Sequence, residues 1–175
     1  MKTLLLLIIL TMTGCIGSPE GVISVKQFEV NRYLGKWYEI ARLDHRFERG
    51  LTGITAEYSL KDDGALKVIN SGYDVDTGEL EQAEGKAYFT GASDVGRLKV
   101  SFFGPFYGGY HIIALDKQAY QYAMVAGPDR DYLWILARTP NLEPVILDEL
   151  IARAKAFGFA VDKLIYTGHS QAQGQ

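Results

Sequence analysis

The sequence predicts an all-β protein, folded as an eight-stranded antiparallel up-and-down β-barrel with one α-helix packed outside it near the C-terminus. Three observations predict this fold. Aromatic residues make up 12% of the 175 residues, with 19 glycines and 5 prolines, a composition that favours strands and tight turns over a helical bundle. Short runs that alternate polar and apolar residues are separated by turn sequences. A single amphipathic segment near the C-terminus carries the apolar stripe of a helix.

The first 14 residues have the composition of a secretory signal peptide. Lys2 provides a positive charge, residues 4–10 form an unbroken apolar run, and small and polar residues follow. The run is too short to span a bilayer, and no longer apolar run follows it. We therefore expect residues 1–14 to be removed, and we expect no transmembrane helix.

Cys15 is the only cysteine of the chain, so it cannot form an internal disulfide. Residues 12–15 resemble the lipobox of bacterial lipoproteins, with Met12 where Leu is most common. The resemblance implies cleavage before Cys15, acylation of Cys15 and, because Ile16 rather than Asp follows, delivery to the bacterial outer membrane. Several acyl chains anchor a protein stably. We expect residues 15–24 to be the lipidated cysteine and a short flexible tether.

Eight predicted strands fill the centre of the chain. Residues 54–60 alternate apolar and polar side chains, which predicts a half-buried strand. Asp63-Gly64 is typical of a hairpin turn, and residues 66–73 form the return strand. Regular spacing and short connections predict a meander, and closing it into a barrel removes the exposed edges. The remaining strands are expected from Trp37 onward and over residues 80–90, 97–103, 110–115, 120–125 and 132–137, with loops at 91–96 and 104–109.

The predicted helix begins near Pro144, which suits a first helical turn, and ends at Gly158. Its apolar face should pack against the outside of the barrel. A short final strand is expected over residues 161–166. The folded domain would then span residues 25–168, and residues 169–175 would form a flexible tail. The apolar face consists of Ile146, Leu147, Leu150, Ile151, Ala154 and Phe157.

Three motifs resemble those of the lipocalin family, in the same order along the chain. Gly35-Lys36-Trp37 looks like the motif that opens the first strand of lipocalins, after a short helical turn in residues 28–34. Residues 127–132 resemble the loop between the last two barrel strands, and Arg138 matches the third motif. Bacterial lipocalins, which also resemble apolipoprotein D, are the most similar subgroup. The structural residues implied by this resemblance are Gly35, Trp37, Asp131, Tyr132 and Arg138.

The resemblance also implies that the Arg138 guanidinium packs across the Trp37 indole at the closed end of the barrel. Such a contact contributes about 0.5–2 kcal/mol. The same guanidinium can bind main-chain carbonyls at the base of the barrel.

No set of residues indicates a catalyst or a metal site. His45, His111 and His169 are not spaced as metal ligands, and no nucleophile or phosphate-loop motif is present. Asp129-Arg130-Asp131 is interpreted as a solvated turn. We therefore expect that the protein is not an enzyme and that it binds neither a cofactor nor a metal ion. The net charge of −3 argues against a nucleic-acid partner.

An eight-stranded barrel can hold one small ligand. The resemblance to bacterial lipocalins implies that this ligand is a fatty acid or a (lyso)phospholipid, and it leaves a homodimer possible. Alternation along the strands predicts the inward-facing residues, with tyrosine hydroxyls placed to meet a polar head group. The expected lining is Ala56, Tyr58, Val68, Asn70, Ala87, Val100, Phe102, Tyr110, Ile112, Tyr122 and Met124.

Arg42, His45, Arg46 and Arg49 cluster just after the first predicted strand. They would form either a basic lip for an anionic head group or a solvated loop. Two other functions stay open beside lipid binding. One is a lipid-modifying isomerase or hydrolase that depends on Tyr110 or His111. The other is a surface interaction protein whose barrel is filled with side chains.

Overall fold

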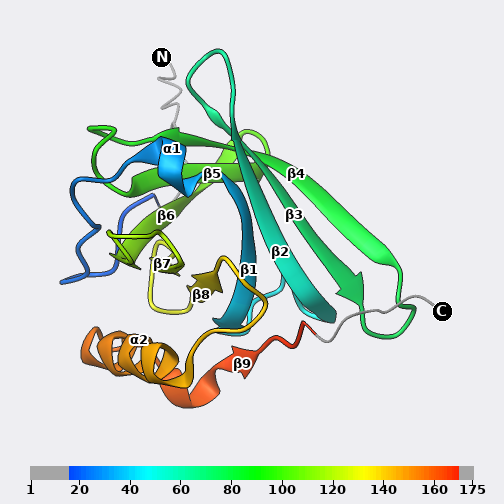
Figure 1. Cartoon of the computed structure of the whole chain (residues 1–175). Helices are drawn as coiled ribbons and strands as arrows, with labels where there is room; N and C mark the ends of the chain where they lie inside the picture. Colours follow the sequence, from blue (N-terminus) through cyan, green and yellow to red (C-terminus); the bar gives the residue numbers. More distant parts are fainter. Residues whose placement is uncertain (1–15, 170–175) are drawn as a thin grey trace, which may run out of the picture.

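Eight antiparallel strands close on themselves in the computed structural model, which describes residues 16–169 (Figure 1). Each strand pairs with the next, and β1 pairs with both β2 and β8, so the barrel has no open seam. The predicted signal peptide and Cys15 lie outside the described residues. The strands are β1 (Gly35–Arg42), β2 (Leu51–Leu60), β3 (Leu66–Asp74), β4 (Leu80–Phe89), β5 (Arg97–Phe103), β6 (Phe106–Leu115), β7 (Tyr122–Ala126) and β8 (Leu133–Ala137).

The predicted barrel is confirmed, while several element boundaries move. Tyr120 is not in a strand, because its positive φ of 56° places it in the turn before β7. The loop expected over residues 104–109 is short, since β6 already begins at Phe106. Residues 161–166 divide into a 3₁₀ turn, η1 (Val161–Lys163), and a two-residue strand, β9 (Ile165–Tyr166), which pairs with β1.

Helix α2 (Pro144–Ala156) lies along the outside of the barrel, as the lower-left part of Figure 1 shows. Pro144 occupies the first turn, and Gly158, with φ of +84°, follows the helix end. Leu150 and Ala154 are buried against the outer faces of β6, β7, β8 and β1. All six residues of the predicted apolar face belong to this outer cluster, so the expected placement of the helix is confirmed.

The base of the barrel is closed by a short helix and an arginine–tryptophan contact. Helix α1 (Val30–Tyr33) crosses this end, and the Trp37 Nε1–H donates to the Tyr33 carbonyl at 2.8 Å. The Arg138 guanidinium lies 3.9 Å from the Trp37 ring centroid. It also donates to the carbonyls of Lys36 (2.8 Å), Arg32 (2.7 Å) and Tyr120 (3.3 Å). One side chain therefore binds three separate segments at the base.

Residues 16–24 lie against the barrel rather than forming the flexible tether expected from their composition. Pro19 and Val22 are buried. The His111 Nε2 donates to the Gly17 carbonyl at 2.8 Å, and the Arg130 Nη2 donates to the Glu20 carbonyl at 2.6 Å. The segment is fixed because two of its apolar side chains, Pro19 and Val22, gain burial and two of its carbonyls accept hydrogen bonds from the barrel.

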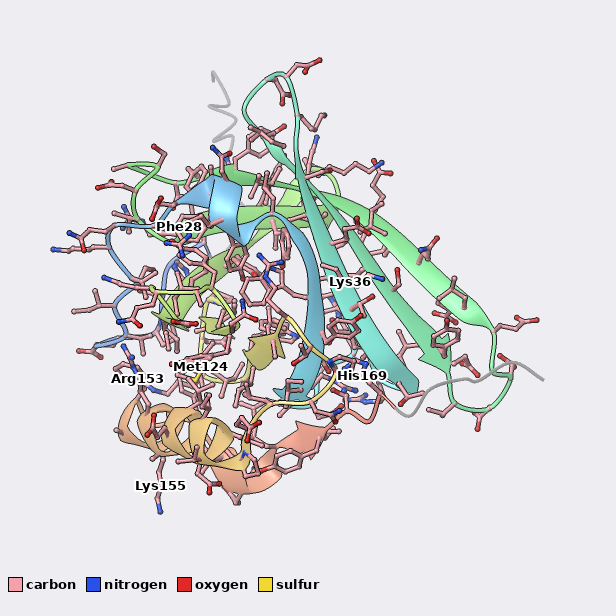
Figure 2. All side chains as sticks on the ribbon, viewed as in Figure 1. Phe28, Lys36, Met124, Arg153, Lys155 and His169 are labelled. Carbon is pink, nitrogen blue, oxygen red and sulfur yellow. The ribbon has the colours of Figure 1, made fainter. Side chains whose placement is uncertain are left out.

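The C-terminal boundary also differs from the expectation. His169 was expected in the flexible tail, but its Nε2 donates to the Glu39 carbonyl at 2.6 Å and its ring packs edge-on against Tyr38. Figure 2 shows His169 beside the end of β1. Within residues 16–169, no helix is long and apolar enough to span a membrane.

Replacing Arg138 with Met should lower the free energy of unfolding by about 2–3 kcal/mol, because charge-assisted bonds to main-chain carbonyls and the cation–π contact are lost together. Urea unfolding followed by tryptophan fluorescence measures the change. Arg153→Met is the matched control, since the exposed Arg153 guanidinium lies over the Phe157 ring at 5.7 Å and its loss should cost less than about 0.5 kcal/mol. Equal effects of the two substitutions would contradict the role assigned to Arg138.

Candidate functional site

The inner faces of the strands define a lumen above the closed base. Eight of the eleven residues expected to line it belong to the inner hydrophobic cluster. Asn70 pairs with Ala56 across β2 and β3, so its side chain shares the inner face. The eight are Ala56, Tyr58, Val68, Ala87, Val100, Phe102, Tyr110 and Ile112.

The expectation for β7 is wrong. Tyr122 and Met124 belong to the outer cluster under helix α2, and Figure 2 shows Met124 between the barrel wall and that helix. Ala123 and Val125 face inward in their place. Alternation gives two faces to a strand without saying which face is inner, and β7 is apolar on both faces because the helix covers the outer one.

The lower half of the lumen is filled by side chains. Trp37, Tyr33, Leu66 and Leu98 are each no more than 2% exposed. Above them the Tyr110 hydroxyl lies 2.7 Å from that of Tyr33 and 2.8 Å from that of Tyr58. The hydroxyls of Tyr58 and Tyr110 were expected to bind a head group, and instead the Tyr110 hydroxyl bonds to those of Tyr58 and Tyr33.

Burial raises the pKa of all three of these tyrosines, so they remain neutral. Three hydroxyls that share two hydrogen bonds leave one O–H free to donate. The floor of the lumen is therefore neutral and carries a single spare donor.

The upper half of the lumen differs in that its inward-facing residues are reached by solvent. Ala83 pairs with Asn70 on the inner face and is exposed, and Asn70 itself is partly exposed. Val100 and Phe102 of β5 are also partly exposed. Gly85 has no side chain beside Phe102, and a Cβ there would lie 2.8 Å from the Phe102 ring. Apolar surface thus stays available above a filled floor.

A buried polar cluster lies near the mouth, built from β1, the β1–β2 loop and β8. Arg42 Nη1 donates to Glu39 Oε1 at 3.1 Å, and Arg42 Nη2 donates to the Glu48 carbonyl at 3.0 Å. Glu48 Oε2 lies 3.1 Å from His45 Nε2 and accepts from Trp134 Nε1 at 3.2 Å. We call these five residues the mouth cluster. Arg42 Nε and His45 Nδ1 are buried without a hydrogen-bond partner among the described residues.

The two carboxyl groups of the mouth cluster have opposite pKa shifts. Burial, the nearby Glu48 charge and a hydrogen bond to Glu48 raise the pKa of Glu39 well above its ordinary value, although Arg42 opposes them. Burial also raises the pKa of Glu48, but the hydrogen bond and charge of His45, together with bonds from Glu39 and Trp134, leave it lowered. Glu39 therefore tends to hold a proton while Glu48 is ionised.

A β-bulge brings Arg42 to the same inner face of β1 as Glu39. The register between β1 and β8 shifts between Glu39 and Ala41, so Ile40 and Ala41 both pack in the outer cluster. Glu39 and Arg42 then both face inward, although strict alternation puts residues three apart on opposite faces. Sequence reasoning missed Glu39, Glu48 and Trp134. The only signal for the two glutamates was a basic residue at a spacing of three, and Trp134 had no such signal.

Neither expectation for the basic cluster after the first strand holds in full. Arg42 and His45 are buried and contact Glu39 and Glu48, so they form no exposed lip. Arg49 is exposed but donates to Asp44 at 2.6 Å. Arg46 remains at the surface, over the Phe47 ring. Acidic neighbours compensate most of the positive charge.

The second motif lies in the β7–β8 loop at the mouth. Tyr132 stacks on Trp134 with ring centroids 6.2 Å apart, and Asp131 donates its N–H to the Asp129 carboxylate at 2.9 Å. No group of three or more His, Cys, Asp or Glu residues within residues 16–169 could hold a metal ion. His111 and Tyr110 point to opposite sides of β6, His111 under the N-terminal segment and Tyr110 into the lumen.

Comparisons with known proteins agree with the three motifs. A family model described as a lipocalin-like domain matches residues 28–169. The chain is 61% identical over 148 residues to the outer membrane lipoprotein Blc of Escherichia coli K12, covering 85% of this chain and 83% of that protein. It is 54% identical over 162 residues to the Vibrio cholerae protein of the same name, covering 93% and 95%. Rat apolipoprotein D is 39% identical over 127 residues, covering 68% and 65%.

A similar solved structure is insecticyanin from the tobacco hornworm Manduca sexta. It has a TM-score of 0.71 at 25% identity, covering 91% of this chain and 90% of that one. The strands of the two proteins therefore follow the same overall path.

Replacing Glu39 with Gln should flatten the loss of stability with rising pH. A carboxyl whose pKa is raised by folding stabilises the fold below its unfolded pKa, about 4.3, and this contribution is lost as pH rises toward its folded pKa. Gln keeps the acceptor for Arg42 without ionising. The measurement is the free energy of unfolding between pH 5 and 8 from urea titrations. Parallel curves for the two proteins would contradict a raised pKa at Glu39, and Glu81→Gln, an exposed carboxyl on β4, is the control.

Proposed function

Because this chain belongs to the lipocalin family, we propose that it binds a fatty acid or a (lyso)phospholipid in its lumen and does so at the bacterial outer membrane. The proposal includes an anchor at Cys15, whose acyl chains hold the barrel at the membrane. The role of the protein is then to bind, store or transport membrane lipids for outer-membrane maintenance.

One observation carries the lipid proposal. Apolar inward-facing residues in the upper half of the barrel, among them Val100 and Phe102, are reached by solvent above a floor that side chains fill. Such a lumen suits an extended acyl chain, since covering its apolar wall contributes about 25 cal/mol per Å². The partly exposed upper half also argues against the filled-barrel alternative.

The mouth cluster supports a polar head group on the ligand. Buried polar atoms are normally hydrogen-bonded, yet Arg42 Nε and His45 Nδ1 have no such partner among the described residues. An oxygen of a carboxylate or phosphate can accept from Arg42 Nε, which lies 3.7 Å from Glu48 Oε2. The acyl chain would then lie below the head group, against the apolar wall.

The site favours a binding protein over an enzyme. The lipid-modifying alternative needed Tyr110 or His111. The Tyr110 hydroxyl is held between Tyr33 and Tyr58, while His111 binds Gly17 on the outer wall. These two side chains cannot act on one substrate. A homodimer remains a prediction, and sedimentation velocity of the purified protein measures it.

Membrane anchoring is supported by the names of the relatives and by the N-terminal sequence. Two relatives more than half identical to this chain are named outer membrane lipoproteins. The lone Cys15 follows an apolar run and small residues, the order expected of a lipoprotein signal.

Replacing Val100 with Phe should weaken binding of a dansyl-labelled fatty acid at least about tenfold, or about 1.4 kcal/mol, because the larger ring occupies the space of the acyl chain. Ile69→Phe is the matched control, since Ile69 pairs with Glu57 and Glu84 on the outward face and its replacement should leave affinity unchanged. Fluorescence titration measures both. A wild-type protein that binds no acyl probe and carries no lipid in native mass spectrometry would overturn the proposed function.

Replacing Cys15 with Ala should release the protein from the membrane fraction, because no acyl chain can then be attached. Cell fractionation followed by mass spectrometry of the N-terminal peptide gives the result. We expect the N-terminal peptide of the wild-type protein to carry acyl groups and that of the variant to carry none. A wild-type peptide that retains residues 1–14 or carries a free Cys15 thiol would contradict the anchor.

A further inference from the structure

The β5–β6 hairpin ends in two exposed aromatic side chains. Phe103 and Phe106 pair across the turn at Gly104-Pro105 and are 71% and 67% exposed. Polar residues are usual at such tips, and neighbouring exposed apolar side chains commonly mark a contact with another molecule or a membrane.

The N-terminal segment brings the anchor to this same hairpin. The Gly17 and Ile16 carbonyls lie so close to Gly109 of β6 that a Cβ there would approach them to 2.9 and 3.1 Å. Gly109 is three residues from Phe106, or about 10 Å along a strand. Cys15 is the residue directly before Ile16 in the sequence. Acyl chains on Cys15 would therefore begin close to the two phenylalanines.

The wall between the anchor and the hairpin tip has the chemistry of a membrane interface. Lys99 pairs with Gly109, and its ammonium group lies 4.8 Å from the Tyr107 ring centroid and 5.9 Å from that of Tyr88. Lys86 of β4 is exposed beside them. Tyrosine rings favour the head-group level of a bilayer, and lysines extend toward anionic lipid phosphates.

We propose that the β5–β6 hairpin docks on the lipid bilayer, with Phe103 and Phe106 at the level of the acyl chains and Tyr107, Lys99 and Tyr88 at the level of the head groups. The proposal rests on the anchor at Cys15. Docking in this orientation sets the edge of the lumen against the membrane, because Phe102, one residue before Phe103, faces the inside of the barrel. Lipid would then pass between bilayer and lumen along the hairpin.

The test uses the acylated protein in vesicles of phosphatidylethanolamine and phosphatidylglycerol. Acylated Cys15 has no free thiol and is the only cysteine, so Phe103→Cys and Phe106→Cys each introduce a unique site for a polarity-sensitive fluorophore. Leu60→Cys is the control, because Leu60 is 50% exposed at the closed end of the barrel. All three positions are exposed, so labelling should leave the fold intact, and circular dichroism checks this.

We expect labels at positions 103 and 106 to emit at shorter wavelength and to be quenched severalfold less by iodide than the label at position 60. Equal quenching at the three positions would overturn the proposal. Protection from iodide quenching that appears at high protein density and vanishes at one chain per vesicle would mean that the hairpin contacts a second copy of the chain. That result would also overturn the proposal. Loss of acyl binding in the lumen does not affect this readout, whereas failure of the anchor is seen directly as protein that does not float with the vesicles.

Discussion

The contact between the Arg138 guanidinium and the Trp37 indole is the interaction on which the rest of the structure depends. Arg138 directly follows β8, yet it binds carbonyls of Arg32, Lys36 and Tyr120, which belong to α1, β1 and the turn before β7. A planar donor group with five N–H bonds can serve several acceptors while its face covers an aromatic ring. Because this end is closed and filled, the lumen opens at the other end alone.

Closure also gives the two sides of the barrel wall different roles. The outer faces of β6, β7, β8 and β1 are apolar because α2 and Val22 cover them. The outer wall of β4 to β6 instead carries Tyr88, Lys99 and Tyr107 near the docked N-terminal segment. The molecule is therefore asymmetric about its axis, and an anchor emerging beside β6 would give the barrel a preferred orientation at a surface.

Inside the barrel, polarity changes with height. The floor is neutral, since three tyrosine hydroxyls bind one another and burial keeps them protonated. The mouth cluster is charged, and its ions are compensated within the cluster. Buried charges are costly unless paired, so this cluster needs its partners from β1, β8 and the β1–β2 loop in place. An amphiphile with an apolar tail and a polar head matches this gradient.

The sequence by itself determined the barrel, the outer helix and the order of the three motifs, because periodicity, turn residues and an amphipathic stripe are local properties. It also placed nine of the eleven expected lining residues on the inner face. Only the tertiary structure decided the rest. The bulge at Glu39–Ala41 brought Arg42 to the same inner face as Glu39, helix α2 covered Tyr122 and Met124, and residues 16–24 became fixed on the outside of the barrel. Each of these outcomes depends on contacts between segments far apart in the chain, and such contacts produce no periodic pattern of residues in the sequence.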